Sequence, residues 1–335
     1  MNKNLFVMAA ALALILPVTG CNKSGKLSQL STFKVPSGPV ELKLKWPLGE
    51  RIEQDMDMKQ TMAMTMPGQP GTMKQEMTMG QAYGLTVLQA MPDGGHEVEM
   101  DFISARMGAT TGGKPTLDYD STKKVAADKP NPVADVFGKI VGSKIRFFMD
   151  ASNVVERVEG VDDMLSRLAT DGNSAITTSL KGMYSEGYFK QMMSANRFMP
   201  PNAVQPGDTW PVQLEYPVAA MGTMMLDYTF TFQRWEMHGK RNCARLEFSG
   251  SITTKPDAKA KPGSMSFTIL DGNSSGISWF DPELGKTIDT QLNQNMSMVI
   301  KMPMNTRKKA GAADRMQSIT NQMTQVITIK LASVN

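Results

Sequence analysis

Much of the chain alternates apolar and polar residues with a period of two, which is typical of strands with one buried face. In residues 52–66, Ile, Gln and Met occupy the even positions, while charged residues, Thr and Ala occupy the odd ones. Turn-forming residues fill positions 67–71, and the alternation resumes over residues 73–83. We therefore predict a long hairpin with a methionine face. Its members are Met56, Met58, Met62, Met64, Met66, Met73, Met77 and Met79.

The same alternation predicts strands along most of the remaining chain. They cover residues 40–46, 98–104, 144–149, 154–158, 244–248, 296–304 and 323–331. Pro-Gly turns open two stretches of similar order, so we predict two similar β units, residues 39–160 and 201–335. The expected fold class is mainly β (α+β), with antiparallel sheets that are curved or form a half-barrel.

The middle of the chain follows a different period. Val161, Met164 and Leu168 have helical spacing, and Asp162 lies in the first turn, where the helix dipole favours an acid. Two further stretches, residues 176–183 and 184–193, have similar spacing. The sequence therefore predicts a helical insert over residues 161–200, between the two β units.

The first residues have the order of a secretory signal. Lys3 precedes an apolar run over residues 5–16, which is too short to span a bilayer. Val18-Thr19-Gly20-Cys21 follows and resembles the lipobox of bacterial lipoproteins. The resemblance implies that residues 1–20 are removed and that Cys21 is acylated, so that the protein is held on a membrane through an N-terminal lipid.

The residues after Cys21 bear on location. Asn22 stands where that family's sorting rule places Asp for inner-membrane retention, so the resemblance implies the outer membrane, facing the periplasm. Lys, Ser, Gly and Pro predominate in residues 21–38, which predicts a flexible tether. A Gly-Asp-Thr-Trp strand start at Gly207, the central helical stretch and the terminal hairpins together resemble a family of uncharacterised envelope lipoproteins, which implies no catalytic residue.

Candidate catalytic chemistry is sparse. A net charge of +4 does not indicate a nucleic-acid-binding surface. With two Cys and two His, the chain has few side chains that could bind a metal or act as a nucleophile. Gly272-Asn-Ser-Ser-Gly276 matches a nucleophile elbow, but no His follows His238, and a hairpin loop is the better interpretation. Asp118-Tyr-Asp-Ser-Thr122 matches the motif of haloacid-dehalogenase-like phosphatases. That motif follows an apolar strand, which this sequence lacks at that point, so the match is weak. We expect no enzyme and no cofactor, and Cys243 as a buried strand residue.

Methionine is the unusual component, at 30 of 335 residues. Its flexible thioether fills irregular sheet cores, and this is the simplest hypothesis. A methionine face also suits an apolar ligand or an envelope protein partner, since it repacks around varied shapes. Thioethers are also soft ligands, so periplasmic capture of Cu(I) or Ag(I) is the alternative. We expect a non-catalytic binding or structural lipoprotein of the cell envelope.

Overall fold

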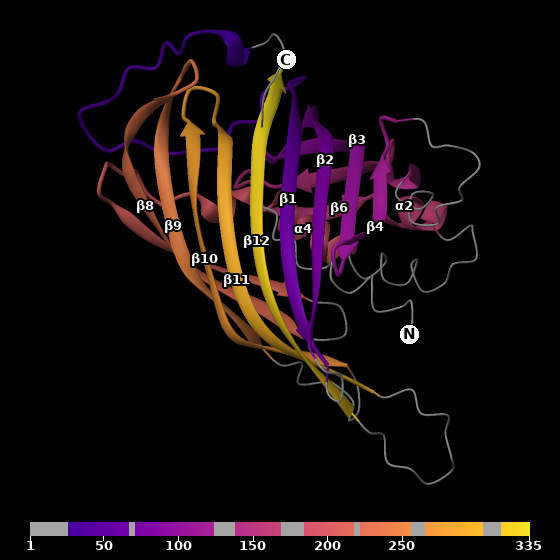
Figure 1. Ribbon diagram of the computed structural model, residues 1–335. Coiled ribbons are helices and arrows are strands. Elements are labelled where there is room, and N and C mark those ends of the chain that lie inside the picture. The colour runs from indigo at the N-terminus through magenta and orange to yellow at the C-terminus, as the bar shows by residue number, and fades with distance from the viewer. Residues whose placement is uncertain are drawn as a thin grey trace.

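The computed structural model describes residues 26–66, 71–123, 138–168, 184–217, 222–255, 265–303 and 316–335. One antiparallel sheet of twelve strands dominates these residues (Figure 1). The strand order is β6-β5-β3-β2-β1-β12-β11-β10-β9-β8-β7, and β4 pairs with β3 beside β5. The sheet is open and strongly curved, so the predicted mainly β fold is confirmed.

Eight of the twelve strands run for 15–19 residues, and burial alternates along β1 and β12 almost throughout. The bounds are β1 (Arg51–Thr65), β2 (Thr72–Ala90), β3 (His96–Thr111), β4 (Lys114–Asp120), β5 (Lys144–Met149), β6 (Val155–Glu159), β7 (Thr209–Pro217), β8 (Thr223–His238), β9 (Arg241–Lys255), β10 (Ser266–Asp281), β11 (Lys286–Pro303) and β12 (Met316–Val334). Strand β10 runs straight through Gly272–Gly276, so the hairpin loop predicted there is wrong.

The strands of the two predicted β units, residues 39–160 and 201–335, form one sheet. Strand β1 pairs with β2 on one side and with β12 on the other, so that Met58 lies between Met79 and Ile327. Every strand pair is antiparallel, and alternate side chains therefore share one face across the sheet. That face, the inner face below, contributes much of the buried core.

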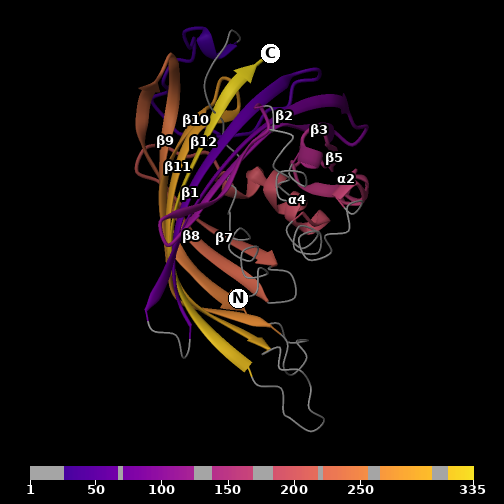
Figure 2. The same cartoon turned by 45° about the vertical axis from the view of Figure 1, so that its right-hand side comes forward.

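Glycines permit the curvature. A Cβ on Gly276 would overlap the ring of Phe248 and the carbonyl of Gln291, and one on Gly250 would overlap the carbonyl of Asp227. These close approaches let β8 to β11 bend around the inner face, which is concave in Figure 2. A larger residue at either position would push the strands apart.

The helices lie on the concave side (Figure 2). Helix α2 (Val161–Leu168) and helix α4 (Glu186–Met193) fall within the predicted insert, and a 3-10 turn, η5 (Ala195–Phe198), follows. Ser185 caps α4 by accepting a hydrogen bond from the backbone amide of Tyr188. Helix α4 contacts both β6 and β7, the two edges of the sheet, and so bridges the open side. The helix predicted over 176–183 lies outside the described residues.

The N-terminal segment crosses the ends of the strands. Residues 40–46 form no strand, contrary to prediction, and only Val40 makes a β-bridge, to Val204. Their alternation instead reflects one-sided burial, since Leu42 is 2% exposed. A short 3-10 helix, η3 (Lys26–Ser28), and the residues after it also lie against the sheet, although composition predicts a flexible tether there.

Candidate functional site

The methionine face lies on the inner side of the sheet. Met56, Met58 and Met62 are 1–2% exposed, and Met77 and Met79 are 6–7% exposed. Met64 and Met73 are cross-strand neighbours, and like Met66 they are only half-buried, toward the far end of the hairpin. The structure therefore brings the seven methionines on β1 and β2 to one face, five of them in the core, whereas Met66 follows the last residue of β1. Cys21 lies outside the described residues.

Strands β11 and β12 continue this face. Met62 is paired with Met323, and Met323 is paired with Met296, so three thioethers lie in one cross-strand row. A second row joins Met58, Met79 and Met107 on β1, β2 and β3. The β1–β2 row follows from the hairpin, whereas the row through β12 depends on a pairing between distant parts of the chain.

Buried amides and hydroxyls interrupt the thioethers. Cross-strand pairing places Ser274, Gln294, Gln325 and Gln60 side by side on β10, β11, β12 and β1. Gln294 and Gln325 are fully buried. The hydroxyl of Tyr228 on β8 donates to Ser274 Oγ at 3.0 Å, and burial raises the pKa of Tyr228. A polar band of these four residues therefore crosses the methionine face.

Several buried polar atoms on the inner face lack a hydrogen-bond partner. Within the described part of the chain, no hydrogen bond reaches Gln54 Oε1, Asn321 Oδ1, Gln325 Oε1 or the Tyr83 hydroxyl. The amide nitrogen of Asn321 faces the Met62 sulfur at 3.5 Å, which leaves its oxygen unused. A buried polar atom without a partner costs about 1–3 kcal/mol, so such atoms normally meet water or a ligand.

An aromatic cluster lies where α4 covers the inner face. Phe189 packs against Phe102 of β3 and Phe147 of β5, with ring centroids 6.4 Å apart in each case. Gln81 Nε2 donates to the Tyr184 hydroxyl at 3.3 Å. Burial raises the pKa of Tyr188 well above its usual value, and Tyr184 and Tyr83 add to the rise. Burial therefore keeps these phenols neutral, and the Tyr184 hydroxyl accepts the hydrogen bond from Gln81.

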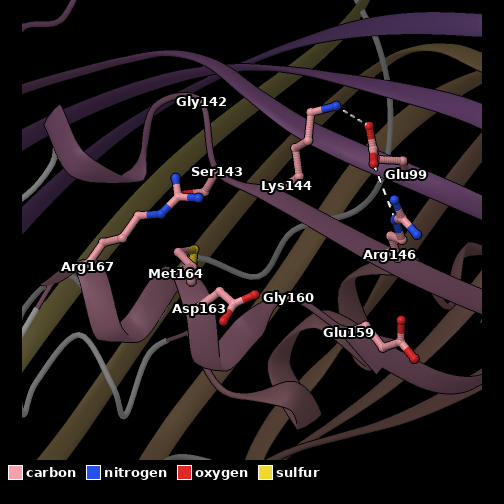
Figure 3. Close-up of a pocket in the computed structure, with 10 residues that line it drawn as sticks. All are labelled: Glu99, Gly142, Ser143, Lys144, Arg146, Glu159, Gly160, Asp163, Met164 and Arg167. Atoms are coloured by element: carbon pink, nitrogen blue, oxygen red, sulfur yellow. Dashed lines mark hydrogen bonds and ion pairs between the residues drawn. The ribbon is translucent and has the colours of Figure 1, made fainter.

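A separate hollow of about 330 Å³ lies between β5 and α2 (Figure 3). Lys144 and Arg146 both point at Glu99, with Nζ–Oε1 and Nε–Oε2 distances of 2.6 and 3.4 Å. Three acids and three bases line the hollow, so it has no charge excess to attract an ion. The six are Glu99, Glu159, Asp163, Lys144, Arg146 and Arg167.

A second hollow, of about 520 Å³, lies along β1 to β4 and includes Asp118 and Asp120. Asp120 accepts hydrogen bonds from the backbone and hydroxyl of Thr122, which lower its pKa. These aspartates end an antiparallel edge strand, whereas the phosphatase motif needs an apolar strand before it.

Other candidate groups have structural settings. Cys243 is fully buried in β9, as predicted, and burial raises its pKa. In the described ranges, no three His, Cys, Asp or Glu side chains gather as metal ligands would. No helix in the described part of the chain is long and apolar enough to cross a bilayer.

Comparison with known proteins identifies a family match. The model of a family of unknown function (DUF6263) matches residues 93–285. No curated protein matches the sequence.

Among solved structures, the chain is similar to lipovitellin, in a structure that describes lipid–protein interactions. The TM-score is 0.40 at 8% identity over 87% of this chain and 26% of that one. The chain thus spans about a quarter of the lipovitellin chain. OccK5 of Pseudomonas aeruginosa gives 0.21 at 7% identity, over 84% and 98% of the two chains. An outer membrane channel of Pseudomonas putida gives 0.18 at 9%, over 89% and 100%. At such scores the likenesses say nothing of what this chain binds.

Proposed function

The chain belongs to the family of unknown function DUF6263. We propose that it is a non-catalytic lipoprotein of the cell envelope, from the lipobox resemblance, and that it holds an amphipathic ligand, from the geometry of the inner face. The lipid on Cys21 would anchor it to the outer membrane, facing the periplasm. The ligand would lie against the inner face of the sheet, between the methionines and the polar band.

The observation that carries this proposal is the set of unpartnered polar atoms among thioethers. Gln54, Asn321 and Gln325 are each at most 5% exposed, and each keeps an amide oxygen without a hydrogen bond from the described residues. An all-protein core gains nothing from such atoms, because each raises the free energy of the folded state. A ligand with hydroxyl or amine groups would donate hydrogen bonds to these amide oxygens.

The methionine thioethers suit the apolar part of such a ligand. Methionine has three rotatable bonds and a polarizable sulfur, so a row of methionines adapts to an acyl chain in several conformations. The outer face of the same hairpin is unsuited to this, because Asp57, Lys59 and Arg106 lie there. An amphiphile with one or more acyl chains and a donor-bearing head group therefore fits the inner face best.

The experiment is native mass spectrometry of the protein extracted from its own membranes in mild detergent, with lipid analysis of any bound molecule. Two variants of β12 form a matched pair, since Gln325 points to the inner face and Gln322 to the outer. Gln325→Leu should lose the ligand, and Gln322→Leu should keep it. A wild-type protein that carries no amphiphile contradicts the proposal.

A soft-metal site is the second candidate, because two rows each bring three thioethers together. Cu(I) and Ag(I) accept three sulfur ligands, and the row of Met58, Met79 and Met107 offers them on adjacent strands. Elemental analysis after exposure to Cu(I) separates the candidates. Stoichiometric copper that Met79→Leu abolishes would favour the metal, and its absence in the wild type would exclude this role.

A further inference from the structure

One end of the sheet is covered by the N-terminal segment. Figure 1 shows this indigo segment crossing the end of the sheet where β8 meets β9 and β10 meets β11. The backbone amide of Ser31 donates to the carbonyl of Lys240 at 2.9 Å, in the β8–β9 turn. Thr32 and Ser31 both bond to Glu283, in the β10–β11 turn. We name this end, with residues 26–50 and the two turns, the N-terminal rim.

Side-chain contacts at Phe33 and at Lys26 hold the N-terminal segment against the sheet. The ring of Phe33 lies 5.2 Å from that of Trp235, and the carbonyl of Phe33 accepts from Asn242 Nδ2 at 2.9 Å. Lys26 Nζ lies 3.1 Å from Glu50 Oε1, and the Glu50 side chain is 4% exposed. The first residue that the structure describes is therefore held at this rim.

The rim exposes large apolar side chains beside lysines. Leu30 is 70% exposed, Leu48 67% and Met237 52%. Lys34 and Lys240 are exposed at the same end. The carboxylates of the rim are already paired. Glu50 faces Lys286 and Lys26, and Asp281 and Glu283 face Arg241, while the exposed Glu41 faces Lys43. The outward surface is thus apolar and basic.

We infer that the N-terminal rim docks on the surface of the bilayer that holds the anchor. Leu30, Leu48 and Met237 would enter the head-group region, and Lys34 and Lys240 would meet anionic lipid phosphates. Exposed apolar residues flanked by lysines are the pattern of interfacial membrane binding. The inference rests on the proposed acylation of Cys21.

Chain length favours this orientation. Five peptide units separate Cys21 from Lys26, and a fully extended chain spans at most about 3.6 Å per residue, or about 18 Å in all. An anchor this close to the rim keeps the rim near the lipid surface. The opposite end of the sheet points away, since β10 alone runs for 16 residues, or about 50 Å.

The test uses the full lipidated protein in vesicles of phosphatidylcholine and phosphatidylglycerol. An environment-sensitive nitrobenzoxadiazole label is attached at Leu30→Cys or Leu48→Cys, and Leu270→Cys is the control. Leu270 is 62% exposed and lies on β10, far from the rim. We expect the emission of both rim labels to shift to shorter wavelength on reconstitution, with the control label unchanged. Lys34→Glu with Lys240→Glu should reduce the shift.

The outcomes separate the two proposals. Protein that floats with the vesicles while its rim labels match the Leu270 label overturns the docking surface and leaves the anchor intact. Protein that does not float overturns the anchor, and the docking surface with it.

Discussion

Arg51 on β1 and Asp101 on β3 form a doubly bonded ion pair across the strand between them. The Nη1–Oδ1 and Nη2–Oδ2 distances are 2.6 and 3.0 Å, and this pair raises the pKa of Arg51. Gly84 of β2 lies under the guanidinium, where any Cβ would overlap it. Asp57 and Arg106 span the same strands over Gly80, with 2.8 Å between Oδ1 and Nη2. Two glycines thus let the arginines lie flat on the outer face.

Gly84→Ala is expected to displace the Arg51 side chain and lower the free energy of unfolding by about 1 kcal/mol, the usual worth of a partly exposed ion pair. Chemical denaturation measures it. Gly38→Ala is the control, because a Cβ at Gly38 meets nothing within 4 Å. In a double-mutant cycle, Asp101→Asn should add little to Gly84→Ala. Full additivity of the two changes would contradict the arrangement.

The local pattern predicted strands best where burial alternates along nearly the whole strand, as in β1 and β12. The pairing of β1 with β12 could not be predicted from the local pattern, because it depends on how segments distant in the sequence come together in the sheet. Residues 40–46 show the limit of alternation: Leu42 is buried, yet the segment crosses strand ends and pairs only at Val40.

The candidate site was predicted in part. The parity of β1 placed Met58 and Met62 on one face, together with Gln54. The polar band needed the register of β10, β11 and β12, which fixes Gln294 and Gln325 beside each other. Hydrogen-bond partners depend on the same register, so the sequence carried no sign that these amides lack them.

Gly276→Ala tests the curvature of the sheet. The added Cβ would overlap the Gln291 carbonyl, which belongs to the backbone and cannot swing aside. We expect a loss of about 1–3 kcal/mol in the free energy of unfolding, typical of overpacking. Gly187→Ala in α4 is the matched control, where the nearest atom is 3.9 Å away and alanine favours the helix by up to about 1 kcal/mol. Equal effects of the two changes would contradict the close approach.

Asp281→Ala tests the buried pair at the N-terminal rim. Arg241 and Asp281 side chains are 5% and 0% exposed, and Asp281 Oδ1 also accepts from the Glu283 amide at 2.8 Å. Removing the carboxylate leaves the buried guanidinium with Glu283 as its remaining carboxylate partner, so we expect a cost of about 3 kcal/mol, the lower end for a broken buried pair. Asp281→Asn keeps the amide contact and should cost less. Glu215→Ala breaks an exposed pair with Lys255 and should change the free energy of unfolding by under about 1 kcal/mol.

Acid should release the N-terminal segment from the rim. The hydrogen bond from Thr32, helped by Ser31 and Arg241, lowers the pKa of Glu283 from 4.5 to about 2. A lowered folded-state pKa contributes stability above the unfolded value, and this is lost as the pH falls from about 4.5 through about 2. The Thr32 amide also donates to Glu283 Oε2, at 3.2 Å. Hydrogen exchange at this amide, corrected for its intrinsic rate, should therefore speed up over that window. In Glu283→Gln the amide should exchange quickly at neutral pH, and a pH response like the wild type's would contradict this account.

The two cysteines give a chemical test of the anchor and the core together. Burial raises the pKa of Cys243, so its thiol should not react with a disulfide reagent in the native protein at neutral pH. In denaturant the protein from membranes should show one reactive thiol, because acylation would convert the Cys21 thiol into a thioether. Cys243→Ala should show none, and intact mass spectrometry should find the added lipid. Two reactive thiols in the denatured wild type would refute acylation, and rapid native labelling of Cys243 would refute its burial.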